Sequence, residues 1–166
     1  MEVFCPSRAN LLWYPLTAWR FERAALREMR RRSLCPDAIY AHFAVPPGTA
    51  AARAGKKLGI PAFFAYGEST PKLLKQYGAR RAARTLQSVS GVIAVSTDAA
   101  HTVGTYGLAR PERVRVFPNG VDAKRFHPMD RETCRAAWGI PQSAFVLAFV
   151  GAFSARKGAA RASEAI

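Results

Sequence analysis

The sequence predicts an α/β fold built on a parallel sheet with helices on both faces. Short apolar segments alternate along the chain with longer segments of helical periodicity. The apolar segments are nearly continuous in hydrophobic residues, which is typical of strands covered on both faces. We therefore expect a Rossmann-like domain whose post-strand loops meet at one edge of the sheet, where ligands bind in such folds.

The strands are expected where these apolar segments are bounded by turn-forming residues. The chain opens with what reads as the end of a strand at 2–5, so a full first strand is missing from the predicted domain. The later strands are expected at 38–43, 61–66, 91–96, 114–117 and 145–150.

The helices are expected between these strands. Thr17 can cap a first helix over 17–32, and Pro36 ends that region. A helix over 47–58 stops at Gly59, and Pro71 suits the first position of the next helix. The remaining helices are expected at 71–88, 97–106, 130–138 and from Lys157 onward.

Length and composition restrict the class of protein. A chain of 166 residues that is 49% hydrophobic is normally one compact domain. It has no apolar run of the ~18–20 residues that span a bilayer, and the N-terminus does not resemble a signal peptide. The three cysteines are odd in number and far apart, which argues against a disulfide framework or a zinc site and favours a reducing cytosol.

The net charge of +14 indicates an anionic partner. Nucleic acid, an anionic membrane surface and a phosphate-bearing substrate are the candidates. No helix-turn-helix, zinc finger or aromatic RNA platform is recognisable, so no nucleic-acid partner is expected and the membrane is preferred. The residues expected to face the membrane come from the helices at 17–32 and 71–88 and are Arg27, Arg30, Arg31, Arg32, Arg80, Arg81 and Arg84.

Four segments carry a resemblance to a known family. They are PDAIYAHFAVPPGTAAARAGKKLGIPAF (36–63), GVIAVSTDAAHTV (91–103), RVRVFPNGVDAKRFHP (113–128) and FVGAFSARKG (149–158). In this order and spacing they resemble the family 4 glycosyltransferases, which have the GT-B fold. The resemblance implies an N-terminal acceptor domain at 1–117, an interdomain crossover at 118–144, and the first strand and helix start of the donor domain at 145–166.

The resemblance also implies an activity. Family members transfer a sugar from a nucleotide-sugar to an acceptor with retention of configuration, usually without a metal, so no cofactor or metal is expected. The acceptor is expected to be a glycan or lipid-linked saccharide. The expected location is the cytoplasm, peripherally on the inner face of the cell membrane. The sequence stops before the family's paired glutamates, so this chain alone is expected to be inactive.

Donor-site candidates follow from the last segment. Lys157 matches the family lysine that neutralises the leaving diphosphate, and Gly151 and Arg156 complete the expected diphosphate site. The family's arginine position falls on Ala152, a departure that puts donor affinity in question. Alternatively, Lys157 is a solvated lysine at a helix start.

Acceptor-side candidates lie after the strands. His42 and Glu68 are the catalytic candidates, although His42 could be structural and Glu68 could only cap the next helix through its charge. Tyr66, Gly67 and Asn119 are expected to line the cleft, with Asn119 alternatively shaping the crossover turn. Tyr66-Gly67 stands where the family has histidine-glycine.

A second function remains open at this point. The chain could be a non-catalytic truncated module that binds an anionic membrane or other polyanions through its basic helices.

Overall fold

The computed structural model describes residues 14–68, 70–155 and 157–165. It divides the chain into two compact units, Met1–Gly120 and Val121–Ile166, and each is described here by itself. The expected strand end at 2–5 lies outside the described residues.

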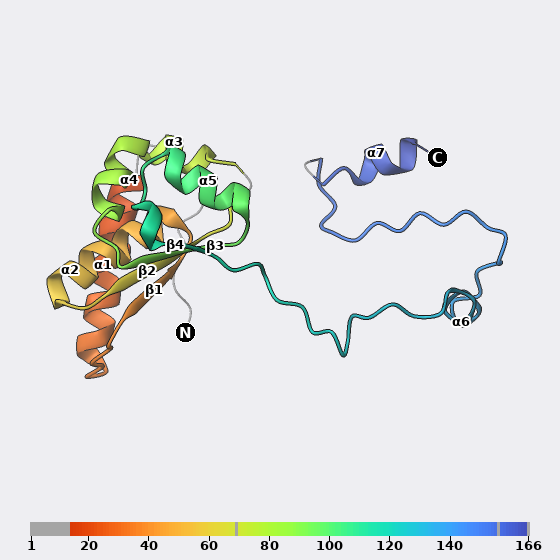
Figure 1. The fold of residues 1–166 in the computed structure, drawn as a ribbon, viewed down its shortest axis with the longest axis horizontal. Coiled ribbons are helices and arrows are strands. Elements are labelled where there is room, and N and C mark those ends of the chain that lie inside the picture. The colour runs from red at the N-terminus through yellow and green to blue at the C-terminus, as the bar shows by residue number, and fades with distance from the viewer. Residues whose placement is uncertain (1–13, 69, 156, 166) are drawn as a thin grey trace. The chain divides into compact units, whose positions relative to one another are not determined.

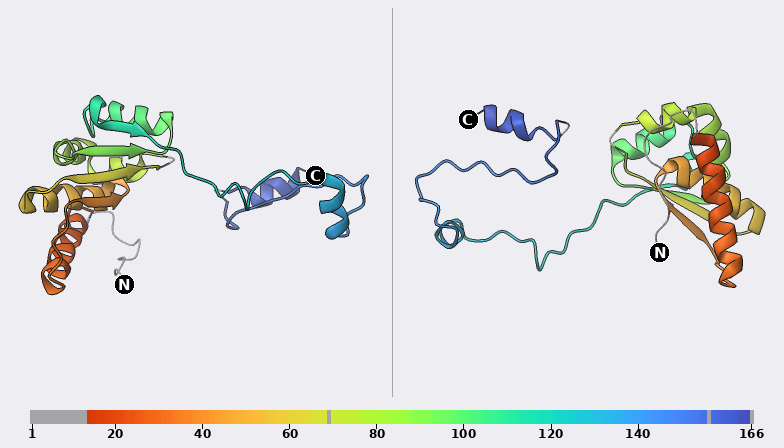
Figure 2. Two further views of the ribbon diagram at one scale, coloured as in Figure 1. Left: turned by 60° about the horizontal axis from the view of Figure 1, so that its bottom comes forward. Right: turned by 180° about the vertical axis from the view of Figure 1, so that it is seen from behind.

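The first unit is built on a four-stranded parallel sheet (Figures 1 and 2). Its strands are β1 (Ile39–His42), β2 (Ala62–Tyr66), β3 (Gly91–Ala94) and β4 (Val114–Val116), in the order β1-β2-β3-β4. In the register, Ala41 pairs with Phe64 and Phe64 with Val92. The predicted α/β class with a Rossmann-like parallel sheet is confirmed.

The helices of this unit lie between the strands, as expected. They are α1 (Tyr14–Arg31), α2 (Thr49–Leu58), α3 (Lys72–Tyr77), α4 (Ala79–Leu86) and α5 (Thr97–Thr105), with a π-helical turn η2 (Ala44–Gly48) and a 3₁₀ turn η3 (Pro111–Arg113). The single helix expected at 71–88 is divided in two by Gly78, whose φ of 95° no α-helix can contain.

The core lies on one face of the sheet. Strand residues Ala41, Phe64, Tyr66, Val92 and Ala94 pack in one cluster with buried side chains of all five helices. On the opposite face, Tyr40 is 57% exposed. The sequence predicted helices on both faces of the sheet. Among the described residues, however, the five helices whose side chains enter this cluster all pack on one face. The strand order advances in a single direction, so right-handed crossovers place the connecting helices on the same side.

The second unit contains two short helices, α6 (Arg131–Ala137) and α7 (Ala159–Glu164). Asp130 caps α6 by accepting a hydrogen bond from the Thr133 N–H at 2.8 Å. The strand expected at 145–150 is not formed, because the described part of this unit offers no neighbouring strand for its backbone groups. Its apolar side chains are correspondingly exposed, Phe145 by 83% and Val150 by 96%.

Two helical glycines provide a paired test of the packing of α2 on β2. A Cβ on Gly55 would lie 2.9 Å from both the Ala62 Cβ and the Ile60 carbonyl oxygen, whereas Gly104 in α5 has nothing within 4 Å. We expect Gly55→Ala to lower the free energy of unfolding by about 1–2 kcal/mol through overpacking. Gly104→Ala should raise it by up to about 1 kcal/mol, the gain in helix propensity. Urea unfolding of both variants checks this; a stabilised Gly55→Ala variant would contradict the close α2–β2 contact.

Candidate functional site

The carboxyl ends of the parallel strands meet at one edge of the first unit. In the register, His42 at the end of β1 pairs with Ala65, and Tyr66 at the end of β2 pairs with Ala94 at the end of β3. The loops that follow these strands are therefore neighbours, as the sequence predicted.

Glu68 connects two of these loops. It lies two residues beyond β2, and its Oε1 accepts a hydrogen bond from the Ala44 N–H, after β1, at 3.3 Å. Its Oε2 is buried and has no hydrogen-bond partner among the described residues. Burial raises the pKa of Glu68, against the smaller opposing effects of backbone N–H groups and of His42. This carboxyl group is held in place at one oxygen, while the other is a buried acceptor without a partner among the described residues.

The loop after β1 is unusually constrained. Phe43 has a φ of 76°, a left-handed conformation that is unfavourable for a non-glycine residue. The Phe43 carbonyl accepts the Gly48 N–H at 3.0 Å, and its ring packs edge-on to His42 with centroids 4.3 Å apart. Since a Cβ on Gly48 would lie 2.8 Å from the Phe43 oxygen, glycine is needed there. The exposed His42 ring therefore stands beside a loop of defined shape.

Tyr66 and Gly67 occupy different environments. The Tyr66 side chain is 1% exposed, so it packs in the core. Only the backbone of Tyr66 can therefore line the cleft in the way expected from the sequence. Burial, reinforced by the negative charge of Glu68, raises the pKa of the Tyr66 phenol to about 12. Gly67 is exposed, and a Cβ there would lie 3.1 Å from a Val95 methyl group, so a larger residue would need Val95 to shift by a few tenths of an ångström.

Asn119 lies in the exposed segment that follows β4. The Phe117 N–H donates to the Ala94 carbonyl at 2.9 Å, so strand pairing continues one residue past β4 before the chain leaves the sheet. Asn119 comes two residues later, at the end of the first unit.

The donor-site candidates form a turn within the second unit. Gly151 has a φ of 156°, and a Cβ there would lie 4.0 Å from the Lys157 Cδ, so the lysine stem passes beside this glycine. The Lys157 N–H donates to the Ser154 carbonyl at 3.0 Å. Arg156 lies outside the described residues. The turn therefore brings Gly151 and Lys157, two of the three residues expected at the diphosphate site, close together.

A second cation at this turn was missed by the sequence reasoning. Arg161 donates through Nη2 to the Ala155 carbonyl at 3.3 Å, which folds its guanidinium back over the turn. The signal was available, because Arg161 follows Lys157 by four residues and side chains at that spacing share a helix face.

The basic residues of α1 separate into two groups. Arg31 binds Glu28 through Nε at 2.8 Å and Nη2 at 2.6 Å, and Arg32 also pairs with Glu28. These hydrogen bonds hold the pKa of Glu28 well below its usual value, at about 2. Arg27 and Arg30 instead line a groove together with Arg20, Arg23 and Lys57, which the sequence reasoning did not select. Arg80, Arg81 and Arg84 are exposed on α4, away from that groove.

The described residues hold neither a candidate metal site nor a candidate membrane-spanning helix. No group of three or more His, Cys, Asp or Glu side chains in residues 14–68, 70–155 and 157–165 could hold a metal ion. No helix in the same ranges is both long and apolar enough to cross a membrane.

The pH dependence of stability tests the environment of Glu68. A raised pKa means that the folded protein holds the carboxyl proton more tightly than the unfolded chain does. The tighter proton binding stabilises the folded state. This stabilisation is fully present below the usual pKa of 4.5 and is lost as the pH rises through the folded-state pKa. Glu68→Gln keeps an oxygen acceptor for Ala44 and cannot ionise. We expect its free energy of unfolding, relative to wild type, to rise between about pH 4 and pH 8.

Urea unfolding at several pH values measures this difference. Glu112→Gln, which removes an exposed carboxylate from the same unit, controls for net charge. A difference between Glu68→Gln and wild type that falls with increasing pH would show that Glu68 is instead stabilised as the anion.

The fold defines an α/β protein with a Rossmann-like parallel sheet, a class whose members bind ligands at the carboxyl ends of the strands. More specifically, the chain belongs to Glycosyltransferase Family 4, whose family model matches residues 2–125. The resemblance stated from the sequence is thereby confirmed.

Curated relatives agree with this assignment. The Bacillus subtilis (strain 168) protein that carries the name of a teichuronic acid biosynthesis glycosyltransferase, TuaC, is 32% identical over 155 residues, covering 89% of this chain and 38% of the relative. A D-inositol 3-phosphate glycosyltransferase 1 from Catenulispora acidiphila is 44% identical over 61 residues, 37% of this chain and 14% of the relative. This chain therefore spans less than half of each of these relatives.

Solved structures share the fold. Anabaena Alr3699/HepE in complex with UDP aligns with a TM-score of 0.56 and 22% identity, over 71% of this chain and 32% of that one. The complex of the same protein with UDP-glucose aligns with a TM-score of 0.53.

Proposed function

We propose that this chain belongs to a retaining glycosyltransferase that transfers a sugar from a nucleotide-sugar to a glycan or lipid-linked acceptor without a metal. One observation carries the proposal, namely that the family match over residues 2–125 covers the whole described edge of the sheet. The UDP and UDP-glucose bound in the similar structures favour a nucleotide-sugar donor. The teichuronic acid biosynthesis named for one relative favours a glycan acceptor.

Glu68 and His42 are assigned to the acceptor. The buried Oε2 of Glu68 would accept a hydrogen bond from a substrate hydroxyl after a shift of the surrounding side chains, and its other oxygen is already held by the Ala44 N–H. Because the loop after β1 is constrained by the same hydrogen bond, the exposed His42 ring keeps its place beside Glu68. Preorganised groups of this kind need little rearrangement when the transition state forms.

Lys157 is assigned to the donor diphosphate, with Gly151 and Arg156. A phosphate oxygen can approach the backbone at Gly151 because no Cβ stands there. The Lys157 stem passes beside that glycine, so its ammonium group can neutralise charge that develops on the leaving diphosphate. Arg161 at the same turn adds a cation in a sequence whose family arginine position is occupied by Ala152.

We also propose a place of action. The net charge of +14 favours reversible attachment to an anionic surface, and a lipid-linked acceptor would be met at the inner face of the cell membrane. In this proposal residues 1–117 serve the acceptor, 118–144 form a crossover, and 145–166 begin the donor-binding part.

The product of the reaction tests this function. The protein that carries these residues together with a complete donor-binding part would be incubated with a panel of nucleotide-sugars and saccharide acceptors. We expect nucleotide release that depends on the acceptor, and a product whose anomeric proton coupling in NMR matches that of the donor. An inverted anomer would refute retention, and the absence of acceptor-dependent release with every donor would refute the function.

A further inference from the structure

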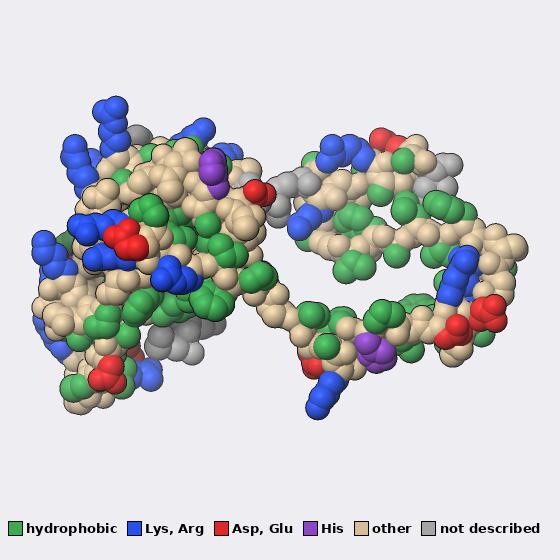
Figure 3. Space-filling view, in the orientation of Figure 1, with side chains coloured by type: hydrophobic (Ala, Val, Ile, Leu, Met, Phe, Trp, Pro, Cys, Tyr) green, Lys and Arg blue, Asp and Glu red, His purple; other side chains and the backbone are tan. Residues whose placement is uncertain are grey.

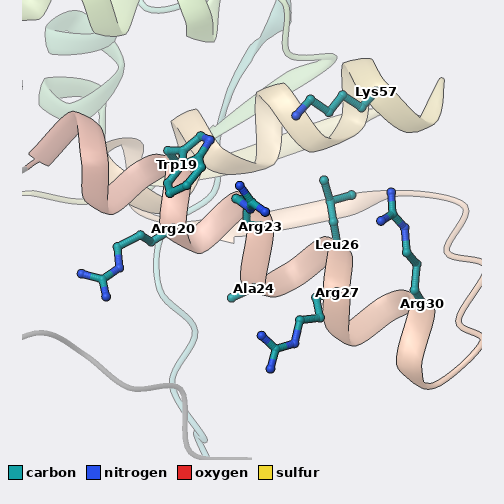
Figure 4. Close-up of a pocket in the computed structure, with 8 residues that line it drawn as sticks. All are labelled: Trp19, Arg20, Arg23, Ala24, Leu26, Arg27, Arg30 and Lys57. Atoms are coloured by element: carbon teal, nitrogen blue, oxygen red, sulfur yellow. The ribbon is translucent and has the colours of Figure 1, made fainter.

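A basic groove lies between α1 and the C-terminal part of α2. It has a volume of about 620 Å³, and its cations are Arg20, Arg23, Arg27, Arg30 and Lys57. In Figure 4, Arg23 and Arg30 extend from α1 toward α2, which contributes Lys57, while Arg20 and Arg27 extend from the outer side of α1. The groove thus has charged groups at its centre and along its rim.

The sequence of α1 produces this arrangement. The four arginines are spaced by three, four and three residues, which places them on one face of a helix. Trp19 and Leu26 come one position before Arg20 and Arg27 and form the apolar part of the lining. Trp19 is 43% exposed, and the Arg23 guanidinium carbon lies 4.6 Å from the centroid of its ring.

No carboxylate of the described residues neutralises the arginines of the groove. Glu28 is occupied by Arg31 and Arg32, and the buried Glu22 pairs with Lys57. In the part of the chain that the structure describes, no carboxylate lies within ion-pair distance of the four groove arginines. Positive charge concentrated in a concave surface attracts anions from a distance.

We propose that this groove is a binding site for the phosphate headgroup of an anionic lipid. The proposal deepens the membrane attachment proposed above and rests on it. Arginine binds phosphate oxygens through parallel N–H donors, and the neighbouring Trp19 and Leu26 suit the boundary between headgroups and acyl chains. A site for a soluble phosphate would not need this half-exposed apolar wall. Attachment through the groove would orient the first unit on the membrane.

Vesicle binding by the chain tests the groove against net charge alone. Figure 3 shows Lys and Arg side chains elsewhere on the visible surface of the first unit, so a variant with the same charge change is required. The groove variant is Arg23→Gln/Arg27→Gln/Arg30→Gln, and the matched control is Lys124→Gln/Arg125→Gln/Arg131→Gln, which removes three exposed cations of the second unit that belong to no proposed site or membrane surface. Lys57 is left unchanged because it pairs with the 2% exposed Glu22.

We expect the groove variant to bind vesicles of phosphatidic acid and phosphatidylcholine at least about tenfold more weakly. This decrease in affinity is smaller than the full contribution of three cations at an anionic surface. The second-unit control should lose less than about threefold, and circular dichroism should show both variants folded. Equal losses in the two variants would overturn the groove while leaving membrane attachment intact. Equal binding of the wild type to pure phosphatidylcholine would overturn attachment through anionic lipid.

Two further measurements identify the ligand. Trp19→Ala should weaken vesicle binding, whereas Trp138→Ala, which removes an 82% exposed tryptophan of the second unit, should not. Pyrophosphate should displace the chain from vesicles no better than sodium chloride of equal ionic strength. Displacement at a much lower concentration of pyrophosphate would assign the groove to a soluble phosphate. Tighter binding to RNA at physiological salt would assign the groove to nucleic acid. Either result would overturn the lipid assignment.

Discussion

Phe64→Ala is expected to lower the free energy of unfolding by about 3–5 kcal/mol, the range for truncation of a buried phenylalanine. Phe64 is 0% exposed at the centre of β2, with Ala41 and Val92 as its neighbours in the sheet. Both neighbours are smaller than phenylalanine, so they cannot fill the space that its ring vacates. The loss should appear in urea unfolding followed by far-ultraviolet circular dichroism, as a lower midpoint with an unchanged slope.

Phe63→Ala is the matched control for that experiment. Phe63 is the preceding residue of β2 and points to the opposite face of the sheet, where it is only partly buried. We expect its truncation to lower stability by about 1 kcal/mol, because less apolar surface returns to water. Equal effects of the two substitutions would mean that the second face is as fully covered as the first, contrary to the packing seen among the described residues.

Lys157→Ala should reduce turnover at least about tenfold in the enzyme that carries this segment with a complete donor-binding part. A hydrogen bond to a charged group contributes about 1.5–3 kcal/mol, and each ~1.4 kcal/mol lost from the transition state is a factor of ten in rate. Because charge on the diphosphate grows as the sugar departs, the decrease should lie mainly in kcat. Initial rates of nucleotide release over a range of donor concentrations measure it.

Lys124→Ala is the control for this prediction. Lys124 is an exposed lysine of the same unit, outside the turn at 151–158, and its replacement changes the net charge equally. Its kinetics should match the wild type. If Lys157→Ala also kept wild-type kinetics, Lys157 would have no part in diphosphate binding, and Arg161 would be the next residue to replace.

The sequence was sufficient for the order and type of most elements. Apolar runs such as 62–66 and 91–94 need a buried environment, so they predict central strands without any knowledge of their neighbours. Local chemistry also marks helix boundaries. Ser96 caps α5 by accepting the Ala99 N–H at 3.1 Å, and Gly59 ends α2 in a left-handed conformation. The turn that brings Gly151 to Lys157 is likewise a matter of neighbouring residues.

The tertiary structure alone decided which side chains could reach a ligand. Strand periodicity marks 61–66 as apolar throughout, so it could not reveal that the Tyr66 phenol enters the core while Glu68, two residues later, reaches across to the Ala44 N–H. That hydrogen bond joins residues 24 positions apart. In α1 the charges were visible in the sequence, but the pairing of Glu28 with both Arg31 and Arg32, which offsets one of their two positive charges, was not. The approach of α2 added Lys57 to the groove.

The strand expected at 145–150 shows the same difference between what the sequence determines and what the tertiary structure decides. Its residues, FVLAFV, have strong strand propensity, yet a strand exists only when a neighbour accepts and donates its backbone hydrogen bonds. Within the described second unit no such neighbour is present, so the segment forms no strand. Propensity and capping are properties of residues close in sequence and can be predicted from it, whereas burial, ion pairing and strand pairing depend on residues that only the folded chain brings together.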